Sequence, residues 1–429
     1  MCAREVVITG TGLITSLGKN VAENWKNLLA MKTGISCYHE DGLPDFSLYK
    51  GKISQFEIPD DISQRLYNQM KFLNRGSLFG FLAAMEAASQ SRINFPDIPP
   101  GRRALYIASE GLTNVSFDFM YPAIKDGTNG KWQDMDFEKL NNSALNKVET
   151  FFLLKHLGNN LFSFLSSFFE LMGPNTSLAS LSPCGGQALE LAYRSIKQNK
   201  ADIALTVGNG SLINELALYE FEGLGMLSQC RTGVQSFKPF DKKRDGSIKG
   251  EGGAAILLES SDTAKKRGAD ILGKIKGCGN CIEFSEDRDL SIPLKVSKRS
   301  IKSAIAEAGC SANDLAFIIP HGSGTQKGDR AELRSVIDAL DGKGADISIC
   351  GLKPYTGDMG ATSDISEIII GIKAATSRVV PATLNFESTE KEFSALRISN
   401  SHLTCEQNSF LSTSYGICGQ SSSVVIETN

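Results

Sequence analysis

Short apolar runs that suit β-strands alternate along this chain with longer amphipathic runs that suit α-helices. The strand-like runs cover residues 6–10, 104–108, 203–208, 254–259 and 316–320, and the helical runs cover 77–91, 187–198 and 297–308. Such alternation is typical of βαβ units, in which helices cover the faces of a sheet. We therefore expect an α/β fold.

One order of elements occurs twice. The helical run 77–91 leads through a Pro-rich loop to 105–113, and the run 297–308 leads to 317–325; both stretches pass from an apolar strand to a Gly/Ser/Thr-rich turn. A duplicated α/β half produces this pattern, and so does chance in any α/β protein. The best candidate boundary is the charged helical segment 260–268, which divides the chain into halves 1–259 and 260–429.

Composition narrows the class of protein. The 429 residues, 41% of them hydrophobic, suffice for two domain-sized cores. A net charge of −3, from 45 basic and 48 acidic residues, implies no nucleic-acid partner. No basic segment followed by an apolar one begins the chain, and the ten cysteines lack a small-domain disulfide spacing, so we expect a cytoplasmic protein.

The most apolar stretch, residues 151–172, is interrupted by polar and charged residues: Lys155, His156, Asn159, Asn160 and Glu170. A membrane helix needs about 20 apolar residues with few or no charges. We predict a helix buried in the core or at a subunit interface. If the helix has a functional role, we expect it to line an acyl pocket.

Cys184 lies in Ser182-Pro183-Cys184-Gly185-Gly186-Gln187, between an extended run (175–181) and a helical one (187–198). Glycines permit a tight turn that exposes the sulfur and directs the first free N–H groups of the helix at it. The positive end of a helix dipole favours thiolate and lowers the pKa of a cysteine. A buried structural cysteine is the alternative, but the two glycines favour a nucleophile.

His321 leaves an apolar strand-like run into the turn Gly322-Ser323-Gly324-Thr325. A histidine at the C-terminal end of a strand is well placed to meet a nucleophile from another unit. We predict that His321 is the base for Cys184. The other three histidines lie in polar loop-like sequence or inside the apolar stretch: His39, His402 and His156.

Three further segments have structural interpretations beside functional ones. Lys353 and Asp358 precede a helical run with Glu367, where Asp358 suits a helix cap. Charges at 241–245 precede a glycine-rich strand entry, but the phosphate-loop order GxxxxGK[ST] is absent, so we interpret a turn held by ion pairs. The CxxC at 278–281 has no second pair, and we predict no metal site.

Taken in order, these segments resemble the β-ketoacyl-acyl-carrier-protein synthases of the thiolase-like superfamily. The resemblance is carried by residues 6–13, Trp25 to Leu29, Thr33-Gly34-Ile35, the Cys184 turn, Lys238-Pro239-Phe240-Asp241 through Gly250-Glu251-Gly252, His321 to Thr325, and the Gly-rich gating loop Ser414 to Gln420. It implies a thiolase-like fold of two duplicated halves in a five-layer αβαβα sandwich, with the site between them. It also implies a homodimer or a heterodimer of similar chains.

The resemblance also implies roles. Cys184 would take an acyl group from an acyl carrier protein, and backbone N–H groups at the cysteine and in the gating loop would form an oxyanion hole. No cofactor of the chain's own is implied, because the phosphopantetheine arrives on the carrier protein. In elongating members two histidines stabilise the enolate formed when a malonyl thioester loses carbon dioxide. Lys353 falls on the family's lysine and Glu367 on its glutamate. The residues implied around the substrate are Thr325, Glu367, Tyr415, Gly416 and Ile417.

The chain departs from the family's pattern at Asp358, which falls on the second histidine. A carboxylate repels an enolate oxygen unless a strongly raised pKa keeps it protonated. Beside a histidine, however, it orients the ring, in the Cys-His-Asp arrangement of thiol acyltransferases and hydrolases. Tyr415 and Ile417 stand where the family has phenylalanines, and Ser211 stands near where many members have glutamate.

We therefore expect an acyltransferase of fatty-acid or polyketide-type biosynthesis that forms an acyl-Cys184 intermediate. Acyl transfer and a modified Claisen condensation both stay open as the second step. The alternative is a non-catalytic partner subunit, like the chain-length factors that pair with active ketosynthases. Retention of both Cys184 and His321 argues against that alternative.

Overall fold

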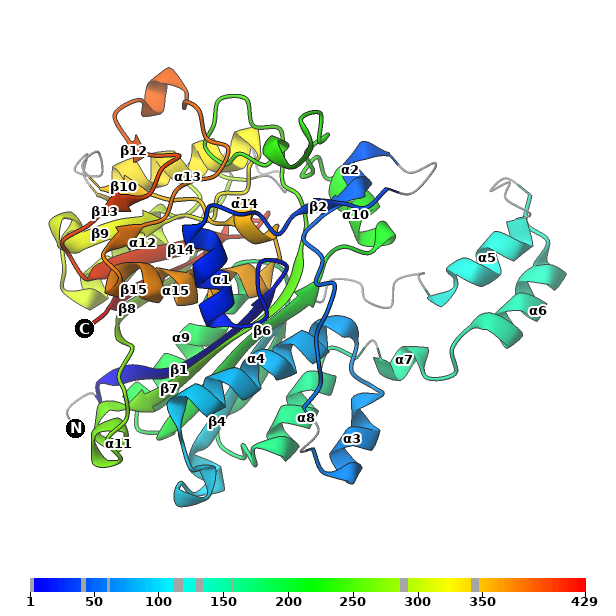
Figure 1. Cartoon of the computed structure of the whole chain (residues 1–429), viewed down its shortest axis with the longest axis horizontal. Helices are drawn as coiled ribbons and strands as arrows, with labels where there is room; N and C mark the ends of the chain where they lie inside the picture. The colour runs from blue at the N-terminus through cyan, green and yellow to red at the C-terminus, as the bar shows by residue number, and fades with distance from the viewer. Residues whose placement is uncertain are drawn as a thin grey trace.

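One mixed sheet of eleven strands organises the computed structural model of the chain, which describes residues 4–39, 44–59, 62–110, 119–128, 134–155, 157–285, 292–340 and 347–429. Figure 1 shows the sheet surrounded by helices. Its strands, in spatial order, are β12 (Arg397–Ile398), β10 (Ser348–Ile349), β9 (Leu315–Ile319), β14 (Ser409–Tyr415), β15 (Gln420–Glu427), β8 (Gly273–Ile282), β1 (Val6–Thr15), β7 (Glu251–Ser260), β6 (Ile203–Ser211), β4 (Arg103–Ser109) and β5 (Asn175–Ala179). Two small ribbons are formed by β2 (Ser36–Cys37) with β3 (Tyr49–Lys50) and by β11 (Val379–Val380) with β13 (Leu403–Thr404).

The two halves of this sheet repeat one topology. The order β1-β7-β6-β4-β5 in the first half corresponds to β8-β15-β14-β9-β10 in the second. Strand directions correspond as well, because β1/β7 and β7/β6 are antiparallel while β6/β4 and β4/β5 are parallel, as are their counterparts. The halves join where β1 and β8 pair antiparallel. The duplication predicted from the sequence is therefore confirmed.

The helices form three layers around the two half-sheets. In the central layer α9 (Cys184–Lys197) packs against α15 (Ala361–Thr376), between the half-sheets. On the outside, α4 (Arg75–Ser91) covers β1, β6 and β7, while α12 (Lys298–Ala308), with α13 (Gln326–Ala339) against it, covers β8 and β15. This is the predicted five-layer αβαβα arrangement. The other helices are α1 (Val21–Leu29), α2 (Asp45–Leu48), α3 (Gln64–Met70), α5 (Tyr121–Thr128), α6 (Phe137–Lys147), α7 (Phe152–Lys155), α8 (Asn160–Phe168), α10 (Glu215–Gly223), α11 (Ser261–Lys266) and α14 (Lys353–Thr356).

The predicted elements lie where the apolar periodicity placed them. The strand-like runs fall on β1, β4, β6, β7 and β9, and the helical runs fall on α4, α9 and α12. The turn at 111–113 in the first copy of the repeat lies outside the described residues, as does His156. The division at 259/260 stays a prediction; it falls at the end of β7, just before α11.

The apolar stretch 151–172 forms two short helices rather than one long one. In α8, Leu161, Phe164 and Leu165 are buried against the core beside α4, whereas Phe151 and Met172 are exposed. The prediction of a core helix is thus confirmed for α8. Across the described ranges, no helix combines the length and the apolar character that crossing a membrane requires.

Close packing of α9 on α15 depends on Gly185. A Cβ at this position would collide with the backbone carbonyl of Ala361 and lie 2.8 Å from the Cβ of Asp364. Because backbone cannot give way as a flexible side chain can, any larger residue would push the two helices apart. The glycine after Cys184 therefore serves helix packing as well as the turn.

We predict that Gly185→Ala destabilises the protein by about 1–3 kcal/mol, the usual cost of overpacking a core. Gly223→Ala is the control, because a Cβ at Gly223 in α10 meets nothing within 4 Å. Thermal unfolding of both variants beside the wild type tests this. Equal melting temperatures for Gly185→Ala and the wild type would contradict it.

Candidate active site

Cys184 is the first residue of α9, directly after the loop that follows β5. Its side chain is buried, with 1% exposure, in the central hydrophobic core. Burial, with the nearby carboxylate of Asp364 as a second cause, raises the pKa of the Cys184 thiol to about 12. The prediction of an exposed sulfur with a lowered pKa is therefore wrong: desolvation and a negative charge outweigh the helix dipole.

Asp364 of α15 accepts hydrogen bonds from the turn that begins α9. The Gly185 N–H donates to Asp364 Oδ2 at 3.0 Å, and the Ser182 hydroxyl donates to Oδ1 at 2.6 Å. Burial raises the pKa of this carboxyl to about 6. The Cys184 N–H is also engaged, by the Leu181 carbonyl at 3.0 Å. The N–H groups of Cys184 and Gly185, the first two residues of α9, are thus already bonded.

A cavity of about 180 Å³ lies beside this turn. It gathers several of the residues that the sequence singles out: His321, Thr325, Asp358, Tyr415, Gly416 and Ile417. Its other lining residues are Ser180, Leu181, Ser182, Met226, Lys249, Ile292, Ser323, Gly360, Cys418 and Gln420. The loop before Cys184, the turn after β9 and the loop between β14 and β15 therefore meet around one space.

The backbone at His321 is fixed from two sides. Its N–H donates to Glu332 Oε1 at 2.7 Å, and its carbonyl accepts from Lys353 Nζ at 2.5 Å. The imidazole lies 4.6 Å from the Tyr415 ring, and its Nδ1 atom is buried without a hydrogen-bond partner in the described structure. Burial, helped by the charge of Lys353, holds the pKa of His321 well below its ordinary value. The ring is therefore neutral at pH 7.

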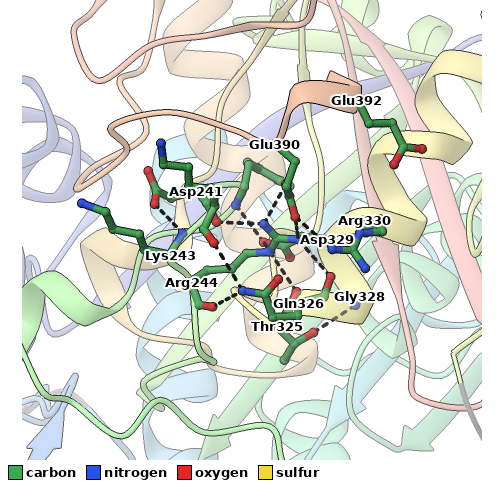
Figure 2. Close-up of polar contacts among 12 residues, drawn as sticks. Asp241, Lys243, Arg244, Thr325, Gln326, Gly328, Asp329, Arg330, Glu390 and Glu392 are labelled. Carbon is green, nitrogen blue, oxygen red and sulfur yellow. Dashed lines mark hydrogen bonds and ion pairs between the residues drawn. The ribbon is translucent and has the colours of Figure 1, made fainter. Parts of the chain in front are cut away.

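The turn after His321 is held by a buried ionic network, shown in Figure 2. Asp329 accepts from the Gly324 N–H and from the Ser323 hydroxyl, both at 3.0 Å. Arg244 is fully buried, lies 3.3 Å from Asp329, and donates to the Thr325 carbonyl at 3.1 Å. Both Arg244 terminal nitrogens also bond the Glu390 carboxylate, at 2.9 and 3.0 Å. The charged segment 241–245 is thus a turn held by ion pairs, as its sequence predicts.

Asp358 bonds a lysine rather than the histidine. Its Oδ2 accepts from Lys249 Nζ at 2.6 Å and its Oδ1 from the Gly360 N–H at 3.1 Å. Burial would raise the pKa of Asp358, but the charges of Lys249 and Lys353 outweigh it and hold the pKa below its ordinary value. The Cys-His-Asp arrangement, in which Asp358 would orient His321, is therefore not formed. The helix-cap interpretation is wrong as well, because the N-cap of α15 is Gly360 and Asp358 bonds the N–H of that residue rather than one inside the helix.

Lys353 and Glu367 lie behind the cavity wall. Lys353 Nζ is 2.9 Å from Glu367 Oε1, and both side chains are buried. Burial raises the pKa of Glu367 to about 8, although Lys353 opposes this. From here Lys353 positions the His321 backbone, and Glu367 positions Lys353.

Family models cover most of the chain. Residues 3–264 match the model described as beta-ketoacyl synthase, N-terminal domain, and residues 281–387 match the C-terminal domain. The chain belongs to the beta-ketoacyl synthase family.

Individual relatives have low sequence identity to this chain but align with it over nearly its whole length. The chain is 26% identical over 425 residues to the 3-oxoacyl-[acyl-carrier-protein] synthase 2 of Coxiella burnetii, covering 99% of this chain and 98% of that protein. A type II polyketide ketosynthase, solved in complex with its acyl-carrier protein, superposes with a TM-score of 0.84 at 22% identity over both whole chains. The ishigamide ketosynthase/chain length factor superposes with a TM-score of 0.78 at 22% identity, also over both whole chains.

Sequence reasoning missed two residues of this ketosynthase-like site, Lys249 and Asp364. Lys249 was visible only as a charge inside the segment 246–252, and its neighbour Asp358 is 109 positions away. Asp364 is one of several polar residues at the start of a helical run, and its bond to Gly185 spans 179 positions. Only the packing of α15 on α9 and β7 gives either residue its place.

We predict that Asp364→Asn speeds alkylation of Cys184 at pH 8, because removing the carboxylate charge lowers the pKa of the Cys184 thiol. Each decrease of one in that pKa gives about ten times more thiolate and a rate about tenfold higher. Because the Asp364 carboxyl has a pKa of about 6, it is ionised at pH 8 and opposes thiolate formation. Below pH 6 it is neutral, so the rates of variant and wild type should converge. Time-resolved mass spectrometry of labelled peptides, with the exposed Cys37 as an internal control, measures this. A constant ratio across pH would contradict the prediction.

Proposed function

We propose that this chain is a β-ketoacyl synthase-type acyltransferase that forms an acyl-Cys184 intermediate, with Asp358 in place of the family's second catalytic histidine. The observation that carries the proposal is the convergence at one cavity of the loop before Cys184, the neutral His321 and the Tyr415–Cys418 loop. Fatty-acid and polyketide assembly are the two settings that the relatives suggest.

His321 would make the buried thiol reactive. In this step the Cys184 sulfur attacks the thioester carbonyl while its proton passes to the imidazole, and the tetrahedral intermediate then expels the carrier's thiol, which takes the proton back. A neutral base suits this step because no free thiolate has to exist beforehand. Gly416 and Ile417 lie on the same cavity wall. The Ile417 N–H is the candidate oxyanion donor, because the Gly416 N–H already donates to the Gln420 carbonyl at 2.9 Å.

The partners we propose are an acyl carrier protein, which would present the thioester, and a second chain of the same fold. The hairpin α5–α6 projects from the body of the molecule (Figure 1), and it exposes Tyr121, Phe137 and Leu145 by 46%, 70% and 84%. Large exposed apolar side chains on a projecting element favour a covering protein. The nine described cysteines are free, in keeping with a cytoplasmic setting.

A specific observation favours a second candidate function, that of a non-catalytic partner subunit. Asp364 occupies the Gly185 N–H and raises the pKa of Cys184, both of which oppose a nucleophilic role. A chain of this kind would pair with an active ketosynthase, as the chain length factor in the ishigamide structure is named to do.

Intact-protein mass spectrometry after mixing with acetyl-, octanoyl- and benzoyl-loaded carrier protein tests the first candidate. We expect an acyl adduct on the wild type and on Cys230→Ala, and none on Cys184→Ala. Cys230 is the matched control because it is equally buried and its thiol pKa is also raised to about 12. No adduct on any form, together with a stable heterodimer whose activity survives Cys184→Ala, would favour the partner subunit.

His321→Ala should slow acyl loading of Cys184 by about 10²–10⁴-fold, which is the usual contribution of a positioned general base. His402→Ala is the control, since its ring lies near the surface, where Nδ1 accepts from the Ala382 N–H at 3.0 Å and Nε2 donates to the Leu29 carbonyl at 3.3 Å. Single-turnover loading rates measure both. An unchanged rate for His321→Ala would remove this histidine from the mechanism.

A further inference from the structure

Lys249 is a buried cation on the wall of the cavity. Its side chain is 1% exposed, and it shares the wall with His321 and Asp358. A lysine is rarely buried this far without a specific reason, because desolvating an ammonium group costs several kcal/mol. None of the roles described above uses it.

The position of Lys249 is fixed by backbone as well as by side chain. The Asp358 N–H donates to the Ile248 carbonyl at 2.8 Å, and the Gly250 N–H donates to the Asp358 carbonyl at 2.9 Å. The ammonium also lies 4.0 Å from the centre of the Phe221 ring, a cation–π distance. The Lys249–Asp358 pair is therefore preorganised and does not form only when a ligand arrives.

The charges and hydrogen bonds of this pair suit an oxygen that gains negative charge. Lysine and carboxylate together carry no net charge. Both carboxylate oxygens of Asp358 already accept, one from Lys249 and one from the Gly360 N–H. The ammonium has three N–H donors, and Asp358 uses one of them within the described structure. What the pair offers to the cavity is thus a donor rather than a bare carboxylate.

We propose that Lys249 is a catalytic residue that donates a hydrogen bond to an enolate oxygen, in place of the histidine that Asp358 replaces. This rests on the proposed function and selects decarboxylative condensation as its second step. The C–C bond to the carboxylate of a malonyl thioester breaks, carbon dioxide leaves, and the electron pair forms an enolate whose oxygen faces Lys249 and His321. The enolate carbon then bonds the acyl carbon on Cys184 and expels the sulfur as thiolate, which takes a proton from solvent.

Release of labelled carbon dioxide from malonyl-loaded carrier protein, measured beside acetyl loading of Cys184, tests the proposal. Lys249→Met alone would strand a buried carboxylate, so the informative variant is Lys249→Met/Asp358→Asn, which removes both charges together. We expect this variant to load Cys184 like the wild type but to release carbon dioxide with a kcat lower by about 10²–10³, the usual loss for one oxyanion donor, and with KM nearly unchanged. Asp358→Asn alone leaves Lys249 without its counter-charge, but even a neutral amine has two N–H donors, so this variant should retain more of the release than the double variant.

The control pair is Lys276→Met/Glu427→Gln, because this ion pair of 3.0 Å joins β8 and β15 at a partly exposed place away from the cavity lining. Thermal unfolding of every variant shows whether it is folded.

The proposal is overturned if the double variant releases carbon dioxide at the wild-type rate, or if Asp358→Asn loses as much of the release as the double variant. It is also overturned if the wild type loads Cys184 but releases none, in which case the acyltransferase assignment stands. Absence of loading by the wild type would instead overturn the proposed function, and this proposal with it.

Discussion

The contact of α9 with α15 is the constraint on which the rest of the site depends. Each helix follows the parallel strands of its own half and packs between the half-sheets, so their N-termini bring the strand ends of both halves to one place. Gly185 allows the close approach, and Asp364 bonds across it. Ser182, two residues before Cys184, contacts Gly360 and Asp364 across this central layer.

Three buried ion pairs lie at or behind the cavity wall. Lys249 pairs with Asp358, Lys353 with Glu367, and Arg244 with Asp329. Replacing such pairs by apolar residues is often neutral or stabilising, so stability alone does not explain their presence. All three cations act at the cavity or on its lining. Arg244 and Lys353 hold the backbone of the turn at His321, while Lys249 lines the cavity itself.

The same geometry accounts for the tension between the two candidate functions. A thiol with a raised pKa beside a carboxylate suits an inert subunit, whereas a neutral histidine and a preorganised ammonium at one cavity suit chemistry on a thioester. Physical chemistry reconciles these features if the proton leaves Cys184 only during attack, since Asp364 then opposes a free thiolate without preventing the reaction.

Local sequence determined the elements and their duplication, because the apolar period of a strand or helix is set by neighbouring residues. It also indicated Cys184 and His321, since each stands at the junction of an apolar run and a glycine-rich turn. Tertiary structure decided the ionisation of these groups. The pKa of Cys184 depends on burial and on Asp364, and the partner of Asp358 is Lys249, 109 residues away. Desolvation and long-range ion pairs are properties of the packed chain, and no local pattern contains them.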